Sequence, residues 1–363
     1  MLALTFDSFF FFIPYFWLAI IFWVFFFFYN LSSVRIKQHS TNDKLRLKDL
    51  KLKESITFVF FDFVILNFIF LFFYFFILRG WACSFFFCNF IVSNSIIYIL
   101  FIYFLFIFFL FFLLISTGKL TLMYDFDFFF SLLNFFIVST FFFMSKSFVS
   151  FFFFLELLSC FVFYQFIVSN TFYSKAKLSS VNSFGLKNNK QVLSVLFFQY
   201  WASFFSSVIF VYVFSLLVFF FGSTDWFILN FLFNFSLVNF MSLDLYIYFF
   251  VFFLFTFAFF IKLGLSPLQL FKIEIYKGLP FLSIFFYTTF YFFIFFLFFI
   301  FITVTYFTNI WLLAWYLIFF FLITGGIYIL NLLFDTKFVK AFFAYSTIIN
   351  TLGFLTLFLT ILT

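Results

Sequence analysis

Long apolar runs separated by short polar stretches dominate the pattern of this chain. A helix rises 1.5 Å per residue, so it needs about 20 apolar residues to cross the hydrocarbon of a membrane. Ten runs reach or approach that length, and each predicts a transmembrane helix. They cover residues 8–29, 56–78, 94–116, 127–144, 148–169, 193–221, 245–270, 279–304, 310–333 and 342–362. Polar side chains interrupt residues 222–244, which are expected to lie at the membrane interface. The pattern predicts an all-α polytopic membrane protein with about ten transmembrane helices.

Composition excludes a water-soluble domain. Hydrophobic residues make up 68% of the 363 residues and charged residues only 9%, whereas about a quarter of a soluble domain is charged. The 95 phenylalanines have thymine-rich codons, so their abundance points to an A/T-rich organellar genome. This inference about the genome rests on codon composition and not on a physical requirement of the fold.

The positive charges gather in every second loop. Sixteen Lys and Arg follow the odd-numbered runs, whereas only Arg79 and Lys146 follow the even-numbered ones, and Lys262 lies in a run. Cytoplasmic or matrix loops carry such an excess, so the basic loops are expected to face the matrix and both ends of the chain the opposite side. The net charge of +7 therefore indicates topology rather than nucleic-acid binding. The sixteen are Arg35, Lys37, Lys44, Arg46, Lys48, Lys51, Lys53, Lys119, Lys175, Lys177, Lys187, Lys190, Lys272, Lys277, Lys337 and Lys340.

Cysteine and histidine do not suggest a metal or redox site. Cys83, Cys88 and Cys160 form no CxxC pair, and His39, in a basic loop, is the single histidine of the sequence. Glycine-rich phosphate loops are also missing from the sequence. We therefore expect that this chain itself binds no metal, flavin, iron–sulfur cluster or nucleotide.

Two ionisable residues lie where an apolar run should have none. Glu156 is near the middle of the fifth run, and only sixteen residues from Tyr246 onward precede Lys262, too few to cross a bilayer. Intramembrane charges are rare and usually face a bundle interior or a proton path. Glu156 has the alternative of being protonated or bonded to a neighbouring hydroxyl, and Lys262 that of extending to the interface.

Gly264 and Pro267 follow Lys262 and break helical continuity. A discontinuous helix with a charged residue at its break is a common construction for an ion site. Burial disfavours a charged lysine and a nearby carboxylate favours it, so a Glu–Lys pair from two spans can hold a proton in a state-dependent way. We expect Glu156 and Lys262 to form such a pair.

Three motifs resemble a known family. KLGLSPLQLFKIEIYKGLP, residues 262–280, resembles the FKLGxxPFHxWxPEVYxGxP segment of NADH dehydrogenase subunit 2, the antiporter-like membrane subunit of respiratory complex I. FLELLSCFVFY is similar to that family's LELxxLxxY stretch and places Glu156 on its essential glutamate. TKFVKAFFAYSTIINTLGFLTL is similar to its QxxLKRxxAYSSIxHxG. The motifs occur in order over roughly residues 150–355, and the EIYKGLP ending favours subunit 2 over subunits 4 and 5 and the Mrp-type antiporters.

The resemblance implies an organisation for the whole chain. Residues 1–126 would form an N-terminal three-helix segment with a basic matrix loop at 30–55. Residues 127–304 would form an antiporter-like five-helix repeat whose seventh helix is discontinuous. Residues 305–363 would begin a second repeat, and we expect a separate polypeptide of about four helices to complete it. The location implied is the mitochondrial inner membrane.

The resemblance also implies a function. The chain would be a membrane-arm subunit of NADH:ubiquinone oxidoreductase that contributes to proton translocation coupled to quinone reduction, with Glu156 and Lys262 as the translocating pair. It would carry out no redox chemistry itself: NADH, FMN, iron–sulfur clusters and ubiquinone would be bound elsewhere in the complex. Its partners would be other complex I membrane subunits and lipids, not nucleic acid.

Departures from the family pattern affect the proton path. The family's sixth-span lysine is Gln199 here, its histidine after the broken helix is Gln269, and its next tryptophan is Phe271; the lysine expected in the eighth span falls among Tyr291 and Phe292. The candidate path therefore runs through Gln199, Gln269 and Lys340, with hydroxyls, amides and water between them. The alternatives are a non-pumping structural membrane-arm subunit or a stand-alone monovalent cation/proton antiporter, and the missing lysines argue against the antiporter.

Overall fold

The computed structural model describes residues 83–85, 90–116, 126–178, 185–238, 242–265, 268–306 and 308–362. The runs predicted at 8–29 and 56–78, the basic loop at 30–55 and Pro267 lie outside these residues.

The described residues are mostly helical. An all-α fold is corrected in one detail, because β1 (Cys83–Phe85) and β2 (Phe90–Val92) form a short antiparallel pair in which Cys83 faces Val92. The longer helices are α3 (Asn94–Ser116), α4 (Phe126–Phe143), α5 (Phe148–Leu178), α6 (Gly185–Phe221), α8 (Ser242–Leu263), α11 (Phe292–Tyr306), α12 (Thr308–Phe334) and α13 (Val339–Leu362). The shorter ones are α7 (Trp226–Val238), α9 (Leu270–Gly278), α10 (Phe281–Phe286) and the π-helical turn η1 (Tyr287–Tyr291).

Helices occupy each predicted run within the described residues, and several ends coincide with the prediction: α3 has the predicted bounds, α5 begins at Phe148 and α6 ends at Phe221. Among the described residues, four helical segments are long and apolar enough to cross a membrane. These are Phe148–Val168, Leu193–Phe221, Tyr246–Leu263 and Ser283–Tyr306. The chain is thus a mostly helical membrane protein, while the count of ten spans and the repeat remain predictions.

The chain divides into two compact units. The first holds the described residues up to Phe130 together with Phe143–Ser145, and thus contains β1, β2 and α3. The second consists of Ser131–Phe142 and Lys146–Thr363. The candidate site lies wholly within the second unit.

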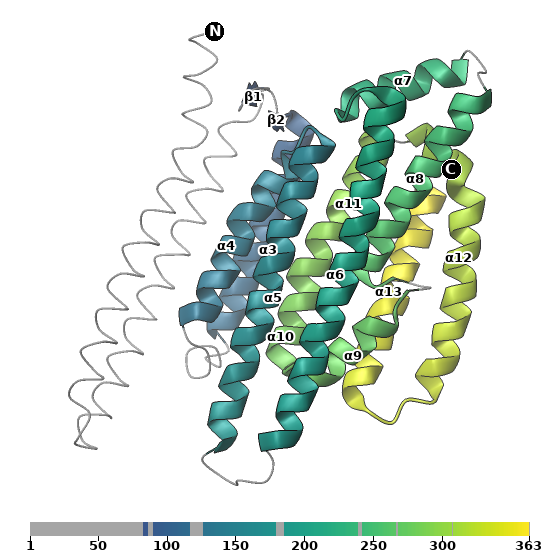
Figure 1. The fold of residues 1–363 in the computed structure, drawn as a ribbon. Helices are drawn as coiled ribbons and strands as arrows, with labels where there is room; N and C mark the ends of the chain where they lie inside the picture. The colour runs from purple at the N-terminus through teal and green to yellow at the C-terminus, as the bar shows by residue number, and fades with distance from the viewer. Residues whose placement is uncertain are drawn as a thin grey trace. The chain divides into compact units, whose positions relative to one another are not determined.

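Aromatic side chains fill the core of the second unit. α6 packs along α5 and α8, and α12 packs along α13 (Figure 1). Phe151 of α5 stacks on Phe298 of α11 with ring centroids 5.1 Å apart, and Phe298 also contacts Phe142 of α4 at 4.0 Å. Helices in lipid associate mainly through close packing, and each aromatic pair adds about 0.5–1.5 kcal/mol. The many phenylalanines therefore hold the helices that carry the site.

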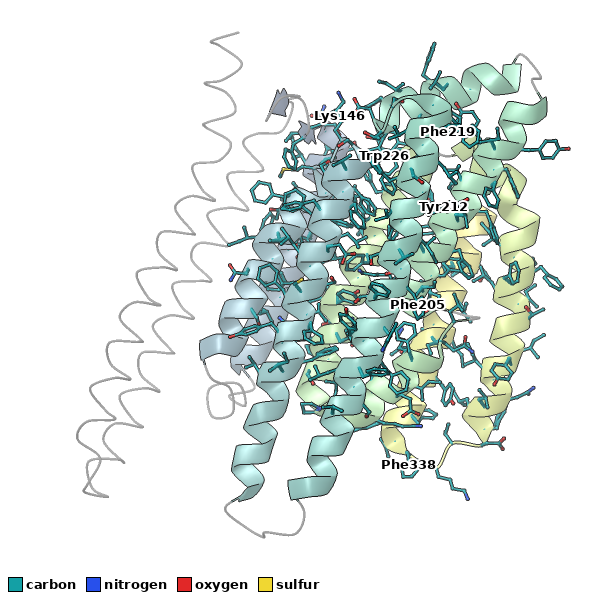
Figure 2. The ribbon with its side chains drawn as sticks, in the orientation of Figure 1. Lys146, Phe205, Tyr212, Phe219, Trp226 and Phe338 are labelled. Atoms are coloured by element: carbon teal, nitrogen blue, oxygen red, sulfur yellow. The ribbon has the colours of Figure 1, made fainter. Side chains whose placement is uncertain are left out.

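One end of the second unit is held by backbone bonds around α7, which runs across the ends of α6 and α8 (Figure 1). The Phe148 amide donates to the Thr224 carbonyl at 2.9 Å, and the Trp226 amide donates to the Lys146 carbonyl at 3.2 Å. Lys146 also pairs with Asp225 at 3.4 Å. Figure 2 shows Lys146 and Trp226 at this end and Phe338 at the other.

Candidate functional site

The site begins where α8 stops. Gly264 has a φ of +63°, a conformation that glycine adopts without strain. Its amide donates to the Ile261 carbonyl at 3.1 Å, and the Leu265 amide donates to the Phe260 carbonyl at 2.9 Å. This is the Schellman arrangement, which satisfies the last carbonyls of a helix. The helix therefore ends at Leu263, one residue after Lys262, and α9 begins only at Leu270.

The end of α8 brings Lys262 to Glu156. The Lys262 Nζ donates to the Glu156 Oε1 at 3.1 Å, which joins α8 to α5 across 106 residues of sequence. Glu156 lies eight residues into α5, or about 12 Å from the start of that helix. The pair is thus well away from the end of the unit that carries Lys146.

The two members of the pair differ in exposure. The Lys262 side chain is 1% exposed, whereas that of Glu156 is 33% exposed. The other oxygen of Glu156, Oε2, accepts a long 3.4 Å hydrogen bond from the Ser159 hydroxyl. Glu156 therefore has a neighbouring hydroxyl, which was its alternative interpretation. Lys262 points into the protein, which does not agree with the alternative that it extends to the interface.

A second buried lysine lies beside the break. Lys272, in the first turn of α9, is 1% exposed, and its Nζ lies 4.6 Å from the centre of the Phe292 ring. Its stem packs against the bend: a Cβ added at Gly264 would lie 3.1 Å from both the Cβ and the Cδ of Lys272. Counting Lys272 among the loop cations was therefore wrong, because it is buried. The orientation inferred from the other fifteen cations stays a prediction.

Tyrosine hydroxyls extend from the pair toward α13. Tyr291 lies near Glu156, and its ring stacks on that of Tyr287 with centroids 5.1 Å apart. Tyr287 in turn meets the Tyr276 ring at 6.2 Å, and the Tyr276 hydroxyl lies 3.3 Å from the Thr347 hydroxyl of α13. Three tyrosines and a threonine therefore connect the surroundings of Glu156 with another helix.

These tyrosines occupy an unusual backbone segment. Tyr287 and Tyr291 are the first and last residues of η1, and such π-helical turns occur frequently at functional sites. Both hydroxyls are buried without a well-formed hydrogen bond, and both residues line a small cavity beside Gln165. The cavity has room for about one water molecule, which would satisfy the hydroxyls.

The two glutamines of the predicted path are also buried. Gln199 of α6 is 3% exposed and Gln269, just before α9, is 1% exposed. The side-chain oxygen of each lacks a hydrogen-bond donor among the described residues. Gln199 also interacts with the Tyr291 hydroxyl. A buried carbonyl oxygen without a donor costs about 1–3 kcal/mol, so both sites favour water or a protonated neighbour.

Lys340 has a different environment from the other path residues. Its Nζ donates to the Leu279 carbonyl at 2.6 Å and lies 3.5 Å from the Lys277 carbonyl, both at the end of α9. A cation is favourable at the C-terminus of a helix. Lys340 therefore links α13 to α9, and the structure does not bring it to the Glu156–Lys262 pair.

Lys272 and the three tyrosines are absent from the path predicted from the sequence. One signal was available: Tyr287 and Tyr291 are four residues apart in a run that is otherwise mostly phenylalanine and aliphatic residues. Lys272 gave no such signal, because a lysine between two apolar runs normally belongs to a loop. Within the described ranges no cluster of His, Cys, Asp and Glu could hold a metal ion.

Comparison with known proteins gives a short match. No family model matches the chain. A segment of 70 residues is 44% identical to the uncharacterized mitochondrial protein ORF4 of Paramecium tetraurelia. The match covers 19% of this chain and 45% of that protein, so the chain spans less than half the length of the curated relative. The similarity supports a mitochondrial origin.

Proposed function

We propose that this chain carries protons across the mitochondrial inner membrane as an antiporter-like subunit of respiratory complex I, similar to NADH dehydrogenase subunit 2. The single observation that carries the proposal is the ion pair between Lys262 and Glu156, 3.1 Å long, with a lysine that is 1% exposed. A buried charge of this kind is costly and is usually retained for function.

The chemistry of the pair suits transient proton storage. Lys262 holds its proton while the Glu156 carboxylate faces it, because an opposite charge favours the ammonium. When Glu156 moves away or takes up a proton, the buried ammonium loses that compensation, and Lys262 gives up its proton. The helix break supports such movement, because α8 is not continuous with α9.

The surroundings supply a route for the released proton. Buried hydroxyls of Tyr287 and Tyr291 and the side-chain oxygens of Gln199 and Gln269 are unsatisfied polar atoms next to apolar rings. Polar groups of this kind, with a water in the cavity beside Tyr291, can pass a proton without a chain of lysines. The absence of lysine at Gln199 and Phe292 therefore does not exclude proton transfer.

The test is a conservative change in the pair. Glu156→Gln keeps the shape of the side chain and removes its charge, so NADH-driven proton uptake by inside-out inner-membrane vesicles should fall well below wild type. Asp225→Asn removes a carboxylate that pairs with Lys146 at the end of the unit, and it should leave proton uptake unchanged. Unchanged uptake with Glu156→Gln in a normally assembled complex would favour a structural, non-pumping subunit.

A further inference from the structure

Lys272 is a buried ionisable group that the proposed pair does not use. Its ammonium position contacts the Phe292 ring, and Glu274, the carboxylate of its own helix, pairs with Lys277 instead. Burying an ammonium is costly, and a cation–π contact returns only part of that cost. The contact with Phe292 therefore does not compensate for the burial of a permanent charge.

The neighbouring elements offer no carboxylate. α9 packs against α6 and α13, and the Lys272 side chain reaches α11. These three helices contain no Asp or Glu, and the carboxylate of α8, Asp244, is near the opposite end of that helix from Gly264. The titratable residues of these three helices are Lys187, Lys190, Tyr200 and Tyr212 on α6, Tyr306 on α11, and Lys340 and Tyr345 on α13; α8 adds Tyr246, Tyr248 and Lys262.

The position of Lys272 on its helix also disfavours a permanent charge. Lys272 is in the first turn of α9, where the partial positive charge of the helix N-terminus disfavours a cation. Lys262 is in the last turn of α8, where the helix end favours one. The two lysines flank one break with opposite electrostatic preferences. Burial lowers the pKa of Lys272 to about 7, so both its charged and its neutral forms are accessible near neutral pH.

The bend connects the two lysines. The stem of Lys272 packs on Gly264, which is two residues after Lys262. The Lys272 side chain therefore lies against the turn that ends α8. Gln269 precedes Lys272 by three residues, and its buried side-chain oxygen lacks a donor among the described residues. A protonated amine or a water molecule beside it would supply that donor.

We propose that Lys272 is a second proton-carrying residue of this chain, which accepts the proton that Lys262 releases and passes it on. In the step an N–H bond of the Lys262 ammonium breaks and an N–H bond forms at the Lys272 amine, with intervening water molecules passing the proton between them. The positive charge moves with the proton, so Lys262 becomes neutral as Lys272 becomes charged. This inference rests on the proposed function of the pair.

Two substitutions separate proton transfer from a structural role. Lys272→Met keeps the apolar stem but binds no proton, and Lys272→Arg keeps a charge that does not leave. Apolar packing alone would tolerate Met, and a fixed charge would tolerate Arg, but a proton carrier tolerates neither. We expect NADH-driven proton uptake per NADH oxidised to fall about twofold or more with either change. Lys277→Met, on the exposed face of the same helix, is the control and should match wild type.

The outcome distinguishes this inference from the proposed function. If Glu156→Gln lowers uptake while Lys272→Met and Lys272→Arg both leave it at the wild-type level, Lys272 carries no proton and the pair still functions. If Glu156→Gln has no effect either, the proposed function itself fails.

A second measurement does not depend on transport. Because the pKa of Lys272 in the folded chain is about 7, below its ordinary value of 10.5, the unfolded chain binds more protons between these values. Stability must therefore rise with pH in that window, and the cost of burying the amine is fully present below pH 7. The thermal midpoint of the purified protein should rise from pH 7 to pH 10, and Lys272→Met should remove part of that rise. Identical profiles for wild type and Lys272→Met would show that Lys272 does not titrate there and would overturn the inference.

Discussion

Two lysine–carboxylate pairs of the second unit make a useful comparison. Lys146 and Asp225 pair at 3.4 Å with side chains 21% and 33% exposed, and Lys262 and Glu156 pair at 3.1 Å with side chains 1% and 33% exposed. The carboxylates are equally exposed, so the difference lies at the lysine. Lys146 is partly exposed, whereas the buried ammonium of Lys262 depends on its partner. Two ion pairs of similar length therefore differ in the cost of removing the carboxylate, which is larger for the buried lysine.

The regions around the two pairs also differ in what holds them together. Backbone hydrogen bonds between Phe148 and Thr224 and between Trp226 and Lys146 hold the first region without help from the ion pair. In the second region the helix itself is interrupted, and the ion pair is a direct polar link between α5 and the end of α8. Backbone hydrogen bonds thus hold the region of the Lys146–Asp225 pair, whereas the Glu156–Lys262 pair itself helps to hold its region.

The largest effect on stability should come from breaking the buried pair. Glu156→Gln leaves the buried ammonium of Lys262 without its carboxylate, so we expect a loss of about 3 kcal/mol in the free energy of unfolding. The thermal midpoint in mild detergent measures it. The double change Glu156→Gln and Lys262→Met removes both charges and should recover part of the loss; a double variant as unstable as the sum of the two single ones would argue against coupling.

An intermediate effect should distinguish two glycines. Gly264 and Gly222 have nearly the same φ, +63° and +62°. An added Cβ at Gly264 would lie 3.1 Å from Lys272 and Phe271 atoms, whereas at Gly222 nothing lies within 4 Å. Gly222→Ala should therefore cost about 1–2 kcal/mol from the backbone alone, and Gly264→Ala should cost more. Equal losses of thermal stability would mean that Lys272 moves aside freely at the break.

The smallest effect should come from the exposed pair. Asp225→Asn removes the charge opposite Lys146, and a partly exposed ion pair contributes less than about 1 kcal/mol. Its thermal midpoint should lie near that of wild type and should depend little on salt concentration. A loss as large as that of Glu156→Gln would remove the contrast between the two regions.

The helices and their ends were largely predictable because local chemistry determines them. Uninterrupted apolar residues mark the spans, and glycine marks the stops after Phe221 and Leu263. The pairing of Glu156 with Lys262 could also be predicted, because each charge is isolated in an apolar run and each needs a partner. In both cases the sequence nearby carries the physical cause.

The environment of Lys272 was not predictable from the sequence. Its burial depends on α9 packing against α6 and α13, which are distant in sequence, and on the space that Gly264 leaves for its stem. A count of charges between apolar runs treats every such lysine as solvated. Only long-range packing distinguishes Lys272 from the exposed Lys277, five residues later in the same helix.

The π-helical turn was hidden for a related reason. α11 has no polar residue before Thr303, so the sequence has no continuous polar face whose phase would shift where the backbone changes. Periodicity predicts a helix there but not its pitch. The turn is recognised from its backbone hydrogen bonds alone.

That turn also sets the register of everything after it. A π-helical turn accommodates one residue more than an α-helical turn. Deleting one residue between Tyr287 and Tyr291 would therefore restore an ordinary helix and rotate α11 by about 100° relative to α10. Buried residues of α11 such as Phe295, Phe298 and Ile302 would then turn away from the core they now fill. The length of this segment, as much as its composition, is a constraint on how the gene can vary.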